Sequence, residues 1–157
     1  MDTIKIEKYQ KGQEIEIHQL IKKVYDEFVS VDYSDEGNKF FYDWIEPSRI
    51  AERQKDQINL LVALWDSKII GMIEIRDNKN ISLLFVDKQY QGQGIAKRLF
   101  QESLKTCIQR DSTLDKFFVH ASPFSIPIYK NLGFIETDSL QENHGIKYLP
   151  MEMMINK

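Results

Sequence analysis

The sequence contains very little cysteine: Cys107 is the only one among its 157 residues. One thiol cannot form an internal disulfide or a cluster of thiolate metal ligands, and we expect no bound metal. An isolated cysteine fits a reducing compartment, so we expect a cytoplasmic protein. Cys107 falls on the apolar side of a predicted helix, which favours packing over nucleophilic chemistry.

Long apolar segments and an excess of positive charge are also missing. The most apolar run, residues 60–65, is far shorter than the roughly 20 residues that span a bilayer. Ile4 and Ile6 alternate with Lys5 and Glu7, which predicts a strand rather than a signal peptide. The formal net charge of −3, with no dense block of Lys or Arg, does not suit the neutralisation of phosphates. We therefore expect neither a membrane nor a nucleic acid as a partner.

The composition is that of a soluble globular protein, with 42% hydrophobic and 29% charged residues. A chain of 157 residues has the size of one domain, and we expect a single domain over residues 1–157. The spacing of the apolar residues predicts helices over residues 12–29, 34–46, 95–108 and 125–132, a helical turn over 49–57, and strands over 4–7, 59–65, 68–76, 81–86, 117–121, 134–137 and 148–155. This order predicts an α/β protein with one mixed, mostly antiparallel sheet and helices on both faces.

The junction between the predicted strand 81–86 and the helix that begins near Ile95 contains Gly92 and Gly94. The first N–H groups of a helix lack intrahelical partners and carry partial positive charge. Glycine lets the backbone approach an anion closely, so the junction suits a phosphate group. The segment is too short for a P-loop and lacks the third glycine of a dinucleotide fingerprint. A plain strand-to-helix turn is the alternative.

Two segments resemble the signature motifs of the GNAT superfamily of N-acetyltransferases. Gln89-x-x-Gly92-x-Gly94 matches the pattern Q/R-x-x-G-x-G/A, and residues 129–134 match Tyr-x-x-x-Gly-Phe. The order of the predicted elements matches the family as well. The resemblance implies a GNAT-like fold with splayed central strands, acetyl-CoA as the co-substrate and a small-molecule or peptide amine as the acceptor. We expect a monomer or a homodimer.

The resemblance also implies which residues contact acetyl-CoA. The backbone N–H groups of residues 91–96 would hold the pyrophosphate, and the exposed backbone of residues 84–86 would pair with pantetheine in a gap beside strand 117–121. Ser122 stands where many relatives have an asparagine that binds the cofactor, and Ser125 at a position that is often alanine. The implied cofactor-binding residues are Leu84, Phe85, Val86, Gln91, Gly92, Gln93, Gly94, Ile95, Ala96, Lys97, Ser122, Ser125 and Tyr129.

Three side chains are candidates for proton transfer. Tyr129 resembles the family's tyrosine near the coenzyme sulfur, and a phenol with a pKa of about 10 can donate to a thiolate at neutral pH. Glu74 and His120 are the candidate bases. The alternatives are an exposed or ion-paired Glu74, a packed or surface His120, and a Tyr129 that only packs its helix.

Acids and aromatic residues share the segment that usually shapes the acceptor site in this family, residues 25–44. Such a mixture suits a cationic amine through charge pairing and cation–π contact. Phe28, Tyr33 and Glu74 are the candidate substrate contacts, although aromatic residues at helical spacing also suit core packing.

Two further functions remain open for the same residues. The first is a catalytically silent acyl-CoA-binding or partner-binding module of the same fold. The second is a protein that binds a different nucleotide.

Overall fold

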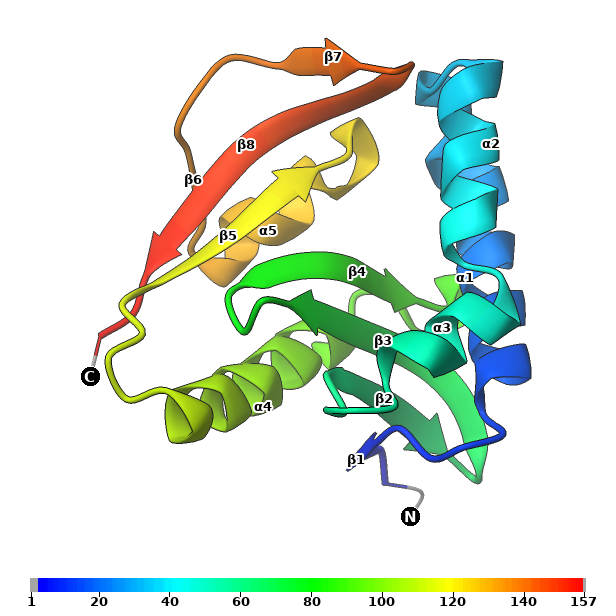
Figure 1. Cartoon of the computed structure of the whole chain (residues 1–157), viewed down its shortest axis with the longest axis vertical. Helices are drawn as coiled ribbons and strands as arrows, with labels where there is room; N and C mark the ends of the chain where they lie inside the picture. The colour runs from blue at the N-terminus through cyan, green and yellow to red at the C-terminus, as the bar shows by residue number, and fades with distance from the viewer. Residues whose placement is uncertain (1–2, 157) are drawn as a thin grey trace.

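The structure, a computed structural model of the chain, describes residues 3–156 (Figure 1). Its strands are β1 (Lys5–Lys8), β2 (Leu60–Trp65), β3 (Lys68–Arg76), β4 (Asn80–Val86), β5 (Lys116–Ala121), β6 (Ile135–Glu136), β7 (Gln141–Asn143) and β8 (Ile146–Met154). Its α-helices are α1 (Glu14–Phe28), α2 (Asp35–Trp44), α3 (Pro47–Arg53), α4 (Ile95–Arg110) and α5 (Ile126–Leu132). Three short 3₁₀ turns complete it: η1 (Ser30–Asp32), η2 (Lys88–Tyr90) and η3 (Pro123–Ser125).

The strands form one open mixed sheet in the order β1-β2-β3-β4-β5-β8-β6, with β7 paired to β8. Strands β2, β3 and β4 form an antiparallel meander. Both of its turns place two residues at positive φ, Asp66 and Ser67 in one and Asp77 and Asn78 in the other. This geometry matches the right-handed twist of the flanking strands, so the turns set the register of the meander.

Helices cover both faces of the sheet, as the sequence predicts. Helices α1 and α3 contribute to a core against one face, and α4 and α5 contribute to a core against the other. Strand β3 serves both cores because its side chains alternate: Met72 joins the first, and Ile73 the second. Gly71 lets α4 pack closely, since a Cβ there would lie 3.2 Å from side-chain atoms of both Ile95 and Leu99.

Strands β4 and β5 are parallel neighbours that soon part (Figure 1). They pair only at Asn80 with Phe118 and at Ile81 with Val119. The register between β3 and β4 shifts at that level, so that Ser82 is an extra residue in β4. A bulge of this kind bends a strand and increases its twist. The remainder of β4 therefore diverges from β5 and leaves an opening in the middle of the sheet.

The β7–β8 hairpin packs against the start of α2 and is hydrogen-bonded to it. The Ser34 hydroxyl accepts from the Gly37 N–H at 3.2 Å, and the Ser34 N–H donates to the Gly145 carbonyl at 2.9 Å. A Cβ on Gly37 would lie 2.4 Å from that carbonyl oxygen, so the two backbones approach closely only because both residues are glycine. The sequence does not predict β7, and it places the short helical segment at 49–57 where the structure has α3.

Candidate functional site

A cavity of about 660 Å³ occupies the opening between β4 and β5. Its walls come from β4, the end of β5, the turn before α4, helix α5 and the α1–α2 region. Segments that are far apart in the sequence thus meet at one place, and both predicted motifs contribute to it.

The turn that precedes α4, together with its first residues, forms one end of the cavity. We refer to residues 91–96 as the glycine turn. Gly92 and Gly94 both have φ of 80°, and Gly94 is the residue that precedes the first turn of α4. No side chain caps this end of the helix, and a Cβ on either glycine would meet nothing within 4 Å. The backbone there is therefore accessible to an anion.

Not every residue predicted around the glycine turn reaches the cavity. Lys97 lines it together with Gln91, Ile95 and Ala96, but Gln93 is exposed and lies outside the lining. Arg98 is directed elsewhere, because its guanidinium donates to the Ile4 carbonyl at 2.9 Å. One basic side chain thus accompanies the backbone at this end.

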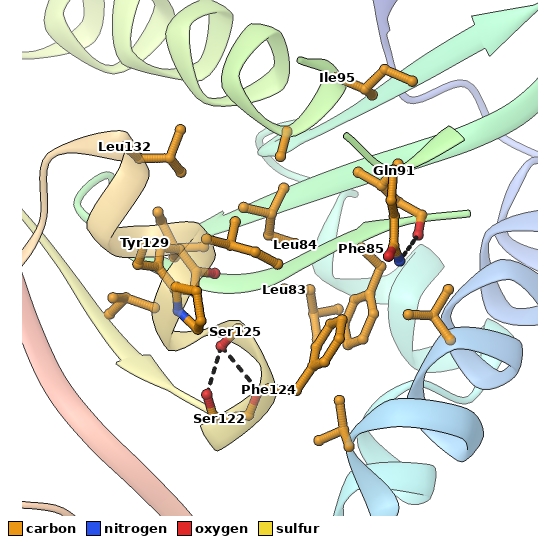
Figure 2. A pocket seen from close by; sticks show the side chains of 18 of the residues that line it. Leu83, Leu84, Phe85, Gln91, Ile95, Ser122, Phe124, Ser125, Tyr129 and Leu132 are labelled. Atoms are coloured by element: carbon orange, nitrogen blue, oxygen red, sulfur yellow. Dashed lines mark hydrogen bonds between the residues drawn. The ribbon is translucent and has the colours of Figure 1, made fainter. Parts of the chain in front are cut away.

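The free backbone of β4 forms a second wall. The Asp87 N–H donates to the Ile70 carbonyl of β3 at 2.8 Å. Since hydrogen-bonded and non-hydrogen-bonded pairs alternate along antiparallel strands, Phe85 pairs with β3, whereas Leu84 and Val86 direct their N–H and C=O groups away from β3. The Val86 carbonyl accepts from the Gln91 side-chain amide at 3.0 Å (Figure 2). Of the predicted backbone edge 84–86, Leu84 and Val86 therefore face the opening and Phe85 does not.

Ser122 and Ser125 stand on the opposite wall, between β5 and α5. The Ser122 hydroxyl donates to the Ser125 hydroxyl at 2.9 Å, and the Ser125 hydroxyl donates to the Ser122 carbonyl at 3.0 Å (Figure 2). Both residues line the cavity, as predicted. Their mutual bonds fix the turn from which α5 starts.

Tyr129 points into the cavity from α5 (Figure 2). Its side chain is 4% exposed and packs edge-on against Phe134 at 5.5 Å between ring centroids. Burial raises the pKa of the Tyr129 phenol above its ordinary value, and the nearby Tyr33 raises it further. Tyr129 therefore carries its proton throughout the neutral range.

His120 lines the cavity from the end of β5. Val119 and Ala121 belong to the core under α4, so strand alternation places His120 on the other face, where its ring stacks on Tyr148 at 4.4 Å. Burial lowers the pKa of the imidazole, and the positive charge of Arg76 lowers it further. His120 is therefore neutral at pH 7 and able to accept a proton.

The structure places Glu74 away from the cavity. The Glu74 side chain is buried at 4% exposure, and its carboxylate accepts from the Arg53 guanidinium at 3.1–3.2 Å and from the Gln54 amide. Helix α3 covers this face of β3; Arg53 is its last residue, and Gln54 follows it directly. Glu74 is therefore ion-paired, which is the alternative that the sequence left open. The position of Glu74 does not support the predicted contact with substrate or the predicted role as a base.

The α1–α2 region supplies the far end of the cavity. Tyr33 lines it, and burial, with a smaller effect of Asp32, raises the Tyr33 pKa to about 12. Phe28 lies behind the lining, where its ring stacks on Phe124 at 4.7 Å. Tyr25 and Phe41 line the cavity and belong to the segment predicted to shape the acceptor site, whereas the sequence did not single out the lining residues Ser82, Phe124 and Asn131. Asn131 lies within the second motif and Phe124 lies five residues before it, but nothing in the pattern shows that their side chains line a cavity.

Three findings concern the rest of the described chain. Burial raises the pKa of the Cys107 thiol to about 11, and its side chain packs in the core under α4. Within residues 3–156, no group of three or more His, Cys, Asp or Glu is arranged to hold a metal ion. No helix in the same range is both long and apolar enough to cross a bilayer.

Comparison with known proteins gives matches along nearly the whole chain. Residues 29–155 match the model of the acetyltransferase (GNAT) domain. A GCN5-related N-acetyltransferase from Rhodopseudomonas palustris superposes with a TM-score of 0.82 at 17% identity, over 99% of this chain and 98% of that one. The PaiA N-acetyltransferase from Thermoplasma acidophilum, solved in complex with coenzyme A, superposes with a TM-score of 0.78 at 18% identity, over 98% of this chain and 99% of that one.

A curated relative matches only in part. GCN5-related N-acetyltransferase 2 (chloroplastic) from Arabidopsis thaliana is 33% identical over 73 residues, which are 44% of this chain and 28% of that protein. The chain thus spans less than a third of the length of this relative. The family model and the shared fold together confirm the resemblance and the predicted fold class.

Proposed function

The chain belongs to the GNAT family of acetyltransferases, and from that premise we propose that it transfers an acetyl group from acetyl-CoA to a primary amine. One observation carries the proposal above all. A single cavity connects the glycine turn, the free backbone edge of β4 and the Tyr129 phenol. These groups are needed to hold a diphosphate, align an extended pantetheine arm and protonate a leaving thiolate.

The residues that are present fit coenzyme A. The N–H groups of the glycine turn are accessible and lie at the positive end of α4, and Lys97 adds a charge beside them. The N–H and C=O groups of Leu84 and Val86 can pair with the two amides of pantetheine as an added strand would. The Val86 carbonyl accepts from the Gln91 side-chain amide, so it faces away from β3, and its oxygen can accept a second hydrogen bond.

Acetyl-CoA supplies a thioester: the neutral amine attacks its carbonyl carbon, the C–S bond breaks, the amine loses a proton and the sulfur gains one. A backbone N–H near Val86 that does not pair with a pantetheine amide is our candidate for polarising the carbonyl oxygen, because Leu84 and Val86 direct their N–H groups into the opening rather than to β3. The chain's main contribution is to hold the amine and the thioester together in the cavity.

Tyr129 and His120 divide the proton transfers in this proposal. Tyr129 keeps its proton at neutral pH because its pKa is raised, so it can donate to the departing sulfur. His120 lacks a proton at neutral pH because its pKa is lowered, so it can accept the proton of the amine, directly or through water. The two groups line one cavity with pKa values shifted in opposite directions, which suits an acid and a base.

The proposal is tested by release of free coenzyme A from acetyl-CoA in the presence of a panel of amines. We expect amine-dependent release, together with binding of acetyl-CoA that is preferred over ATP and NAD. Binding without release under any amine would favour the silent module instead. Tighter binding of ATP than of coenzyme A would remove the assignment.

A further inference from the structure

We propose that the acceptor is a primary amine with one flat, apolar substituent, such as an arylalkylamine, and not a polyamine. This inference rests on the proposed acetyl transfer and concerns the far end of the same cavity. We refer to this end, formed by Tyr25, Tyr33, Phe41, Phe85 and Phe124, as the aromatic compartment.

Ring contacts fix the walls of the aromatic compartment. Tyr25 and Phe41 are stacked at 3.9 Å with an interplanar angle of 5°, and Phe41 lies against Phe85 at 6.0 Å. Phe124 is held from behind by the stacked ring of Phe28. Figure 2 shows Phe85 from β4 and Phe124 from η3 directed into the space between them. Rings that are packed in this way present flat apolar surfaces, which suit a flat apolar group.

No carboxylate is available in this compartment. Among residues 3–156, none of the acidic side chains lines the cavity, and Lys97 and His120 are its only basic ones. The acids of α1 nearby have other partners. Asp26 accepts from Lys22 at 2.6 Å and from Tyr42, and Glu27 pairs with Lys88 at 2.9 Å. Glu36 lies 3.4 Å from His144, and Asp32 acts on Tyr33 but is not part of the lining. The acids of the acceptor segment therefore do not line the acceptor end of the cavity.

The lack of carboxylates favours one kind of amine. Apolar surroundings disfavour the ammonium form, so they lower the pKa of a bound amine and promote the neutral nucleophile. A monoamine loses its charge by this route. A polyamine would bring further ammonium groups into the compartment without a counter-charge, and cation–π contacts with the rings would not offset their desolvation.

The test compares 2-phenylethylamine with spermidine as acceptors, by kcat/KM for release of free coenzyme A. We expect 2-phenylethylamine to be at least tenfold better. Equal or higher kcat/KM for spermidine would overturn this inference and leave the proposed acetyl transfer intact. No release with any amine, with acetyl-CoA bound, would overturn both.

Substitutions in the aromatic compartment test whether its rings cause the preference for 2-phenylethylamine. Phe41→Leu and Phe124→Leu should each raise KM for 2-phenylethylamine at least fivefold and leave the Kd of acetyl-CoA within twofold. Phe40→Leu is the matched control, because Phe40 is also on α2 but is 60% exposed and outside the cavity lining. Thermal melts confirm that each variant is folded. Unchanged KM in both folded leucine variants would contradict the inference.

Discussion

Replacement of Gly94 by leucine separates the anion-binding role of the glycine turn from its role in folding. Gly94 has φ of 80°, and the left-handed conformation costs a residue with a side chain roughly 1–2 kcal/mol. The added side chain meets no protein atom within 4 Å of its Cβ, so no steric clash at the Cβ adds to this cost. We expect a Tm lower by about 2–8 °C in a chain of this size.

The loss of binding should be larger than the loss of stability. The leucine side chain stands where the diphosphate would approach, and loss of one or two hydrogen bonds to a charged group costs about 1.5–3 kcal/mol each. A cost of about 1.5 kcal/mol, for one weak bond, corresponds to a rise in the Kd of acetyl-CoA of about tenfold, and a cost of about 6 kcal/mol, for two strong bonds, to a rise of about 10⁴-fold. Isothermal titration calorimetry measures this Kd directly.

Gly12 provides the matched control. It also has positive φ, 105°, with nothing within 4 Å of its Cβ, and it lies before α1 outside the cavity lining. Gly12→Leu should therefore lower Tm by a similar amount without changing the Kd. Equal Kd values for Gly94→Leu, Gly12→Leu and the unmodified protein, with all three folded, would refute the reasoning about the glycine turn.

Three further changes test other parts of the site. Tyr129→Phe should lower kcat by about 100-fold or more because the proton donor is lost, while the Kd of acetyl-CoA by calorimetry stays within twofold; an unchanged kcat would exclude the acid role. In the unmodified protein, kcat should fall as the pH drops through the lowered pKa of His120, below about 6.5. His120→Gln should reduce kcat by at least tenfold and abolish this fall at acid pH. A fall that persists unchanged in the variant would remove His120 as the base. Glu74→Gln should lower the free energy of unfolding in urea by about 1.5–3 kcal/mol, since charged hydrogen bonds to Arg53 and Gln54 are lost, with the Kd of acetyl-CoA unchanged; a catalytic defect without a loss of stability would restore Glu74 to the site.

Much of the fold follows from local patterns in the sequence. Strand β3 spans 68–76 as predicted, because its apolar run is bounded by turn residues that adopt positive φ. Helix α4 begins at Ile95, where the apolar helical spacing starts directly after Gly94. Strand β7 was not predicted, since Gln141, Glu142 and Asn143 are all polar and show no alternation; it exists because β8 offers a partner.

The site was less predictable, because it depends on which elements face each other. Each of the two motifs is one continuous segment of the sequence, so the sequence alone identifies the glycine turn and Tyr129. The partners of Glu74, at the end of α3 and directly after it, are about twenty residues away, so the ion pair is visible only in the folded chain. The aromatic compartment likewise combines rings from α1, α2, β4 and η3, which no single segment reveals.

A crystal structure of the chain with coenzyme A tests the central claim most directly. We expect the diphosphate within hydrogen-bonding distance of the N–H groups of residues 91–96, and the pantetheine arm between β4 and β5 against Leu84 and Val86. The sulfur should lie beside the Tyr129 hydroxyl. Coenzyme A bound at another surface, with the opening between β4 and β5 empty, would contradict the account.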